Sequence, residues 1–569
     1  MSARTDLMSL GLIALSFSIQ SFAQAPSHTA KTRIATIDQH LEAWDIETAD
    51  AEIDQLKKES SVDRESIAYF EGRIAFERGD YAKALDDLKQ AGLDDKPGSW
   101  LRLVSETISV VGRHEQAESE HFILRYPKGK DSILVPWALS ALEKIRTGLL
   151  TDLGYAPPGK IRVEFVSTAS ELSKVSTLSK EAIRTTGTIA ICKFNKLMVT
   201  SPKAVIKGYD WLDTIAHEYT HLVVSKKSHN TVPIWLHEGL AKYLESRWRG
   251  TAGLSMTPST LALLGSRVRK GAIVPFEKMH PSMALLPTAE DAATAFAEVF
   301  FAVDFMTRHG GPRALERLIN AMAEGHSDRR AVELVLKKPF AEFEKAWMAH
   351  VKSQPFPRDL IPPSSNEKKQ LTENVDKPSK KKRHEISFGD FAEVKEPTAR
   401  RAAHLGEIFR ERNRHKAAAE TFDRAHREVG DRYESVSNKY ALALLELRKF
   451  DAAAKVLEGS LAVHPHSAST NVHLGRIRLR AKDYDRAKAA YLNAVAVNPF
   501  DPEVHVALLA LSNVATDTEL KARALPAVKT LLGLSERDAS LLAEKFLRQD
   551  DLTNVDWESS ESSNNRDGG

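Results

Sequence analysis

The chain has 569 residues, of which 28% are charged and 42% hydrophobic, and it contains 28 glycines and 24 prolines. This composition excludes a collagen-like or wholly disordered chain and indicates a folded protein of about three or four domains. The formal net charge of +3 does not indicate a nucleic-acid partner, and a single cysteine, Cys192, excludes an intramolecular disulfide, a zinc site built on several cysteines and a cysteine-ligated iron–sulfur cluster.

The N-terminal residues 1–23 have the features of a secretory signal peptide. Arg4 precedes an apolar run from Leu7 to Ile19, and the small residues around Ala23 are typical of a cleavage site. The run is shorter than the roughly 20 residues that a membrane-spanning helix needs, which disfavours an N-terminal anchor. We therefore expect cleavage near Ala23, no transmembrane segment in the mature chain, and a secreted or periplasmic location.

A repeated spacing of small residues predicts helical hairpins on both sides of the middle of the chain. In the N-terminal region, 24–117, the residues Gly72, Ala84, Leu88 and Ala91 lie twelve, four and three positions apart. The C-terminal region shows the same spacing at Gly406, Ala418, Phe422 and Ala425, at Gly475, Ala487, Tyr491 and Ala494, and more loosely at Ala441, Ala453 and Leu457. Small residues allow two helices to approach closely, and the bulky ring is expected to fill the groove to the next helix.

These segments resemble tetratricopeptide repeats. The resemblance implies one or two repeat units in the N-terminal region and about three over residues 396–512, with capping helices over 513–550. It also implies a surface that recruits a protein partner. A purely scaffolding role is the alternative.

The region between the repeats has a mixed pattern. Apolar and β-branched runs predict strands at His121–Tyr126, Ile161–Val166, Ile189–Cys192 and Leu197–Thr200, and helical periodicity predicts a helix at Ile133–Leu153. The last two strands are expected to form a hairpin that turns at residues 194–196. Cys192 therefore reads as a core residue and not as a nucleophile.

The segment His217-Glu218-Tyr219-Thr220-His221 carries the chemistry. His217 and His221 are one helical turn apart, so both imidazoles can converge on one ion, with Glu218 beside them. In a chain with 20 histidines this pattern also arises by chance, and the two residues could instead be histidines of an amphipathic helix with satisfied hydrogen bonds. The surrounding sequence must therefore decide.

A second motif, Trp235-Leu-His237-Glu238-Gly239-Leu-Ala241, follows shortly after His221. A helix there can return the Glu238 carboxylate to the metal, while Gly239 and Ala241 are expected to let it pack closely on the first helix. Two histidines, one glutamate and an open fourth position are a common ligand set for catalytic zinc.

The two motifs, HEYTH and WLHEGLAKY, resemble those of gluzincin metallopeptidases, in particular the peptidase MA-like group that often occurs with tetratricopeptide repeats. The resemblance covers about residues 118–353, including closing helices at Thr288–His309 and Gly311–Glu324. It implies an α+β, predominantly α fold with a zincin-like domain flanked by helical repeats, and Zn²⁺ as the cofactor. Residue by residue, it makes His217, His221 and Glu238 the zinc ligands and Glu218 the catalytic general base.

Other residues near the motifs have alternative interpretations. Tyr219 faces away from the histidines and is expected to pack in the core, whereas His237 is expected to lie behind the ligands or at the surface. Asp213 either orients His217 or places a negative charge at a helix N-terminus.

The expected cleft has two further features. The strand Leu197–Thr200 is expected to line it and to hold an extended substrate by strand addition. The family often carries a tyrosine that stabilises the oxyanion where this chain has Phe296, which cannot donate a hydrogen bond. Tyr243 or another group would have to replace it.

The sequence therefore predicts a signal peptide at 1–23, helical repeats at 24–117, a metallopeptidase domain at 118–354, a disordered linker at 355–395, repeats at 396–512, capping helices at 513–550 and a disordered tail at 551–569. Few contacts are expected to cross the linker. The predicted function is an exported zinc metallopeptidase that cleaves a peptide or protein substrate. The alternatives are a non-catalytic interaction scaffold that keeps the peptidase fold as a binding module, and a zinc hydrolase acting on a non-peptide bond.

Overall fold

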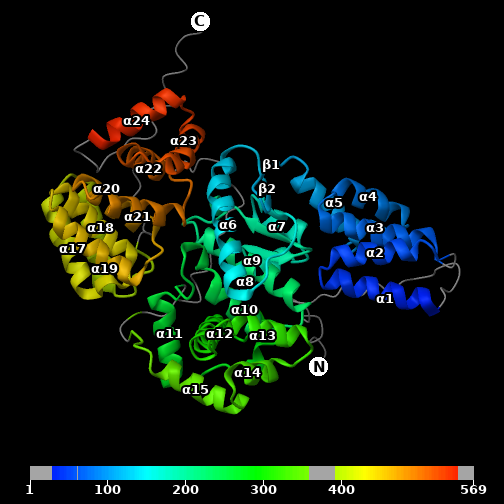
Figure 1. Cartoon of the computed structure of the whole chain (residues 1–569). Helices are drawn as coiled ribbons and strands as arrows, with labels where there is room; N and C mark the ends of the chain where they lie inside the picture. The colour runs from blue at the N-terminus through cyan, green and yellow to red at the C-terminus, as the bar shows by residue number, and fades with distance from the viewer. Residues whose placement is uncertain (1–27, 60–61, 255, 358–359, 361–390, 549–569) are drawn as a thin grey trace, which may run out of the picture.

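The computed structural model describes residues 28–59, 62–254, 256–357, 360 and 391–548. The expected signal peptide, most of the expected linker and the expected tail lie outside these residues. The described chain is mainly helical, with a five-stranded sheet near its middle (Figure 1), which confirms the predicted fold class. In this part of the chain, no helix is long and apolar enough to cross a membrane.

The N-terminal helices form a layered block at one side of the molecule (Figure 1). They are α1 (His28–Glu42), α2 (Ile46–Leu56), α3 (Arg64–Arg78), α4 (Tyr81–Gln90) and α5 (Trp100–Val111). Gly72 of α3 lies so close to α4 that a Cβ atom at this position would lie 2.8 Å from the Leu88 Cγ atom. The small residue is therefore needed for close helix packing, as the repeat spacing predicts.

The sheet has the strand order β1-β2-β3-β5-β4. Its strands are β1 (Glu115–Glu118), β2 (Phe122–Tyr126), β3 (Ile161–Val166), β4 (Ala190–Lys193) and β5 (Lys196–Thr200). The three central strands run parallel, and β1 and β4 are antiparallel edges. The predicted hairpin turns at Phe194 and Asn195, which both have positive φ angles, as a two-residue hairpin turn requires.

The prediction that Leu197–Thr200 lines the cleft is wrong. This segment belongs to β5, whose backbone pairs with β3 on one side and with β4 on the other. Both edges of β5 are therefore already paired. An added strand could pair instead with the outer edge of β4, which lies at the edge of the sheet.

Helices cover both faces of the sheet. On one face pack α6 (Val135–Leu153) and α9 (Trp211–Ser228), and on the other pack α5, α7 (Ala169–Val175) and α8 (Lys180–Thr186). Glu164 of β3 and Lys196 of β5 are fully buried on the second face, where the Lys196 Nζ atom lies 2.8 Å from the Glu164 carboxylate. Tyr81 donates its hydroxyl to the same carboxylate, so this buried cluster attaches the N-terminal block to the sheet.

The part of the middle region that follows α9 is helical. It contains α10 (Ile234–Leu244), α11 (Pro258–Arg269), α12 (Ala289–His309), α13 (Ala314–Ala323), α14 (Asp328–Leu336) and α15 (Phe340–Lys352). The two predicted closing helices correspond to α12 and α13. Gly239 of α10 packs against α12, because a Cβ atom there would lie 2.9 Å from the Val299 carbonyl oxygen. The expectation that Gly239 allows packing on the histidine helix is therefore wrong.

The C-terminal region is a stack of helical hairpins. Its helices are α16 (Pro397–Glu411), α17 (His415–Val429), α18 (Glu434–Glu446), α19 (Phe450–Val463), α20 (Ala468–Arg480), α21 (Tyr484–Val495), α22 (Pro502–Ala515), α23 (Thr518–Leu532) and α24 (Glu536–Arg548). The buried rings of Phe422 and Tyr491 lie over Gly406 and Gly475, which are on the preceding helix of the same hairpin. The rings therefore pack against the small residues of their own hairpin.

The C-terminal hairpins pack directly on the middle region of the chain, so the expectation of few contacts across the linker is wrong. The indole nitrogen of Trp211 donates to the Val495 carbonyl at 3.0 Å, and the Tyr209 amide donates to the Val497 carbonyl at 3.1 Å. Apolar residues of α21–α24 share one hydrophobic core with α6 and α9. A linker's composition describes only the linker, whereas docking depends on the two surfaces that it joins.

The helix α9 is attached to the N-terminal block at its other end. The Lys226 ammonium donates to the Trp44 carbonyl at 2.7 Å, and the Asn230 amide group, just beyond the helix, donates to the Glu42 carbonyl at 3.3 Å. Both helical blocks therefore contact the helix that carries the two histidines of the motif.

Candidate metal centre

The helices α9 and α10 bring His217, His221 and Glu238 together. The Nε2 atoms of the two histidines lie 3.1 Å apart, and the Glu238 Oε2 atom lies 3.4 Å from that of His217 and 3.5 Å from that of His221. Among the histidine, cysteine and carboxylate side chains of the described residues, these three form the group whose atoms lie close enough together to hold one metal ion.

The spacing of these three atoms fits zinc. In a regular tetrahedron with metal–ligand bonds of about 2.0–2.1 Å, neighbouring ligand atoms lie about 3.3–3.4 Å apart. The three measured separations lie within a few tenths of an ångström of that edge. Two imidazoles and one carboxylate are also a usual donor set of catalytic zinc, with a fourth position left open.

The far nitrogen of His217 is held by a residue that the sequence analysis missed. Its Nδ1 atom lies 2.8 Å from the Glu245 carboxylate, which also accepts a hydrogen bond from Lys242. Burial alone would lower the pKa of His217, but its hydrogen bonds to Glu238 and Glu245 outweigh burial and raise the pKa to about 10. These carboxylates therefore favour positive charge at this position, whether a proton or a metal cation supplies it.

Asp213, which the sequence suggested as a partner of His217, makes different contacts. Its carboxylate accepts a hydrogen bond from the Trp248 indole at 2.7 Å and pairs with Arg249. A signal for Glu245 was present in the sequence, because it follows Glu238 by seven residues, which is two helical turns along the same face.

The far nitrogen of His221 contacts His237. Their Nδ1 atoms lie 2.6 Å apart, and the His237 Nε2 atom lies 3.1 Å from the Ser225 hydroxyl. Burial and the neighbouring His221 lower the pKa of His237 to about 3, so His237 is neutral. When His221 directs its Nε2 lone pair at the cluster, its Nδ1–H donates to His237, whose own Nε2–H donates to Ser225. His237 thus lies directly behind a predicted ligand.

Glu218 lies beside the cluster and is 9% exposed. Burial raises the pKa of its carboxyl group, against the opposing effect of the two nearby histidines and of a hydrogen bond from the Cys192 backbone. That contact connects Glu218 to the edge strand β4. Cys192 itself packs partly buried against the core, and burial also raises the pKa of its thiol, which does not suit a nucleophile.

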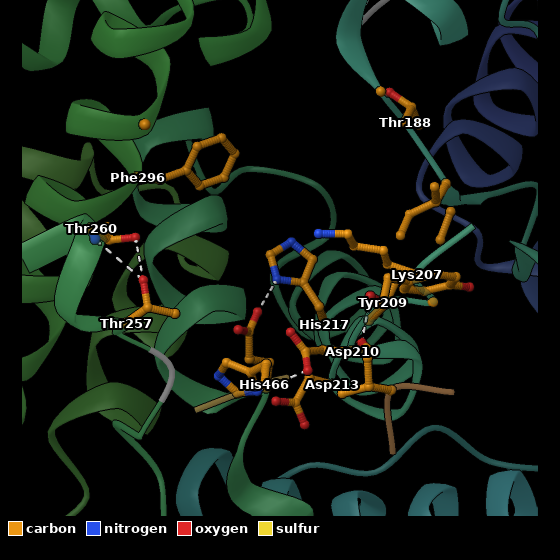
Figure 2. A pocket seen from close by; sticks show the side chains of 18 of the residues that line it. Thr188, Lys207, Tyr209, Asp210, Asp213, His217, Thr257, Thr260, Phe296 and His466 are labelled. Carbon is orange, nitrogen blue, oxygen red and sulfur yellow. Dashed lines mark hydrogen bonds and ion pairs between the residues drawn. The ribbon is translucent and has the colours of Figure 1, made fainter. Parts of the chain in front are cut away.

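A cavity of about 1450 Å³ opens in front of His217 and Glu218 (Figure 2). Its volume exceeds the roughly 300–1,000 Å³ of typical small-molecule sites. Three parts of the chain line it. They are the segment 185–190 leading into β4, residues of the middle region within 206–218, 242–245, 256–260 and 286–296, and the connections of the C-terminal repeats at Glu434, His466–Ser469, Val497 and Asn498.

Among the described residues that line the cavity, the phenol group already donates a hydrogen bond. Phe296 lines the cavity, Tyr209 lines it but donates its hydroxyl to the Thr200 carbonyl, and Tyr243 packs on Phe300 with ring centres 5.6 Å apart, outside the residues that line the cavity. Lys207 lines the cavity and extends toward His217 (Figure 2).

The remaining residue of the first motif, Tyr219, has the packing role that the sequence predicts. It is fully buried, and its ring packs edge-on against Phe122 with centres 5.1 Å apart. It therefore helps to fix α9 on the sheet.

Two parts of the chain match models of known protein families. Residues 148–353 match the model of the Peptidase MA superfamily, and residues 444–511 match a tetratricopeptide-repeat model. The fold and the site thus define a metallopeptidase-like module joined to helical repeats. The likeness to a peptidase MA superfamily domain at residues 148–353 and to tetratricopeptide repeats at residues 444–511 confirms the predicted resemblance.

Solved structures of yeast LTA4 hydrolase show a distant likeness. The native enzyme and its complex with bestatin are both 14% identical to this chain, with TM-scores of 0.27 and 0.26. Each alignment covers 77% of this chain and 67% of the other. No curated protein matches the chain.

Proposed function

We propose that this protein is a zinc-dependent metallopeptidase that hydrolyses peptide bonds. The observation that carries the proposal is the triangle formed by His217, His221 and Glu238, whose three edges suit tetrahedral zinc. The triangle lies beside Glu218, at a cavity large enough for a peptide.

The residues of the site have distinct roles in this proposal. When bound, zinc supplies Lewis acidity for the activation of water and the polarisation of a carbonyl group. His217, His221 and Glu238 hold the ion, while Glu245 and His237 orient the two imidazoles. The Glu218 carboxylate accepts a proton from the attacking water and delivers it to the amine nitrogen of the leaving group.

The edge strand β4 supplies a place for the substrate backbone. Thr188, Ile189 and Ala190 line the cavity next to Glu218, and the outer edge of β4 pairs with no other strand of the sheet. We propose that an extended peptide adds to this edge, with its backbone held by main-chain hydrogen bonds.

Casein, an unstructured protein, provides the test of activity. The full-length mature chain is expected to cleave it, a chelator is expected to stop the cleavage, and added zinc is expected to restore it. Absence of cleavage by protein that carries one zinc ion per chain would favour the non-catalytic scaffold, for which the lack of a phenol donor at Phe296 is the supporting observation.

We also propose that the protein is exported. The support is the charged start, apolar run and small residues of segment 1–23. The mass of the native protein is expected to correspond to a chain that begins just after Ala23. A native chain that retains Met1 would contradict export.

A further inference from the structure

The connections between successive C-terminal hairpins form one wall of the cavity. Glu434 is the first residue of α18, Ser469 is in the first turn of α20, and Asn498 lies in the connection before α22. The repeats thus face the metal cluster with their connecting segments.

This wall is held in a fixed position relative to the metal cluster. The His466 Nδ1 atom lies 2.8 Å from the carboxylate of Asp210, the residue immediately before α9. The neighbouring Gly208 contacts the repeats so closely that a Cβ atom there would clash with the Val497 carbonyl. Because α9 also carries His217 and Glu218, the repeat connections and the catalytic side chains share one rigid attachment.

Both apolar and charged side chains line the cavity. The peptidase side contributes apolar groups, among them Met256, Leu286 and Phe296, as well as charged ones such as Lys207, Glu218 and Lys242. The repeat side contributes polar groups, including the Glu434 carboxylate, which accepts a hydrogen bond from the Ser469 hydroxyl at 2.9 Å. The imidazole on this side, His466, is already paired with Asp210 of the peptidase side, so Glu434 is the negatively charged side chain that the repeats contribute to the described lining of the cavity.

An extended peptide directs alternate side chains to opposite sides. We propose that Glu434 and Ser469 form a distal subsite that binds an extended peptide in which apolar and basic side chains alternate, with a basic side chain facing Glu434. This proposal rests on the proposed function in one respect, because it takes the bound peptide to be the substrate of the enzyme. The repeats then select the substrate directly and are not a separate recruiting module.

Peptide binding tests this subsite without relying on turnover. Two fluorescent ten-residue peptides, one alternating leucine with lysine and one alternating leucine with glutamate, are titrated by anisotropy into zinc-loaded, full-length Glu218→Gln protein. The lysine peptide is expected to bind more tightly. Adding Glu434→Lys is expected to weaken its binding about fivefold and to strengthen binding of the glutamate peptide, as expected when a partly exposed charge pair is reversed.

Two further variants keep the test decisive. Glu434→Gln, which preserves shape, is expected to give an intermediate affinity, and Glu420→Lys, which makes the same change on the exposed surface of α17 away from the cavity, is expected to have no effect. Equal affinities for the two peptides, no binding of either, or insensitivity to both Glu434 variants would overturn the subsite. Peptide binding that depends on Glu434, without cleavage by the wild-type chain, would instead overturn the proposed activity and leave the subsite standing.

Discussion

Replacing Glu218 with glutamine is expected to lower peptide hydrolysis by about a hundredfold to ten-thousandfold while the protein keeps its zinc and its fold. The amide is nearly the same size as the carboxylate, but it cannot accept a proton from water at neutral pH. The loss corresponds to about 3–5 kcal/mol of transition-state stabilisation. Rates of peptide cleavage, measured together with zinc content and thermal unfolding, check this expectation.

Glu238→Ala is the comparison variant, because it removes a predicted ligand instead of a proton acceptor. It is expected to lose zinc and activity together. If Glu218→Gln retained the wild-type rate of cleavage, the general-base role would be refuted. Equal and negligible rates in the wild-type and Glu218→Gln proteins, both containing zinc, would refute the enzyme itself.

Removal of either histidine of the triangle is expected to cost the protein most of its bound zinc. His217→Ala and His221→Ala each leave two of the three protein ligands. The zinc content of either variant, measured by metal analysis, should therefore fall well below the one zinc per chain expected for the wild type. Because the binding free energy of the ion also stabilises the folded chain, the zinc-dependent part of thermal stability is expected to disappear with it.

Glu245→Gln is expected to weaken zinc binding less than removal of a histidine ligand does. Its carboxylate contacts His217 and not the metal, so zinc affinity is expected to fall about tenfold to a hundredfold, as measured by competition with a chelator. The matched control is Asp213→Asn, which removes a nearby buried carboxylate that contacts Trp248 and Arg249 instead of a ligand. Equal zinc affinities in these two variants would show that Glu245 does not position His217.

The metal triangle could be predicted from sequence because most of its geometry is local. His217 and His221 are one turn apart on any helix, and the helix carrying Glu238 follows after a short connection. The strands β2, β3, β4 and β5 could be predicted from their apolar runs for the same reason, whereas β1 (Glu115–Glu118) has no apolar run and was not predicted. The contacts of Glu245 and His237 with the histidines also depend on how α9 and α10 cross, which residue spacing does not specify.

The features that could not be predicted depend on distant parts of the chain. The sequence order of β4 and β5 does not say which one pairs with β3, so the edge strand was assigned to the wrong segment. The placement of Glu434 beside the cavity depends on docking across more than two hundred residues. Both results follow from tertiary packing, which local patterns do not encode.

The attachment of α9 at both ends has a consequence for how the protein unfolds. The repeats hold Trp211 at its start, and the N-terminal block holds Lys226 near its end. Loss of either block would leave the histidine helix without one of its supports, and unfolding of α9 would remove one attachment of each block. The segments that look like separate domains in the sequence are therefore expected to melt in one cooperative transition, with a midpoint that rises with the concentration of free zinc.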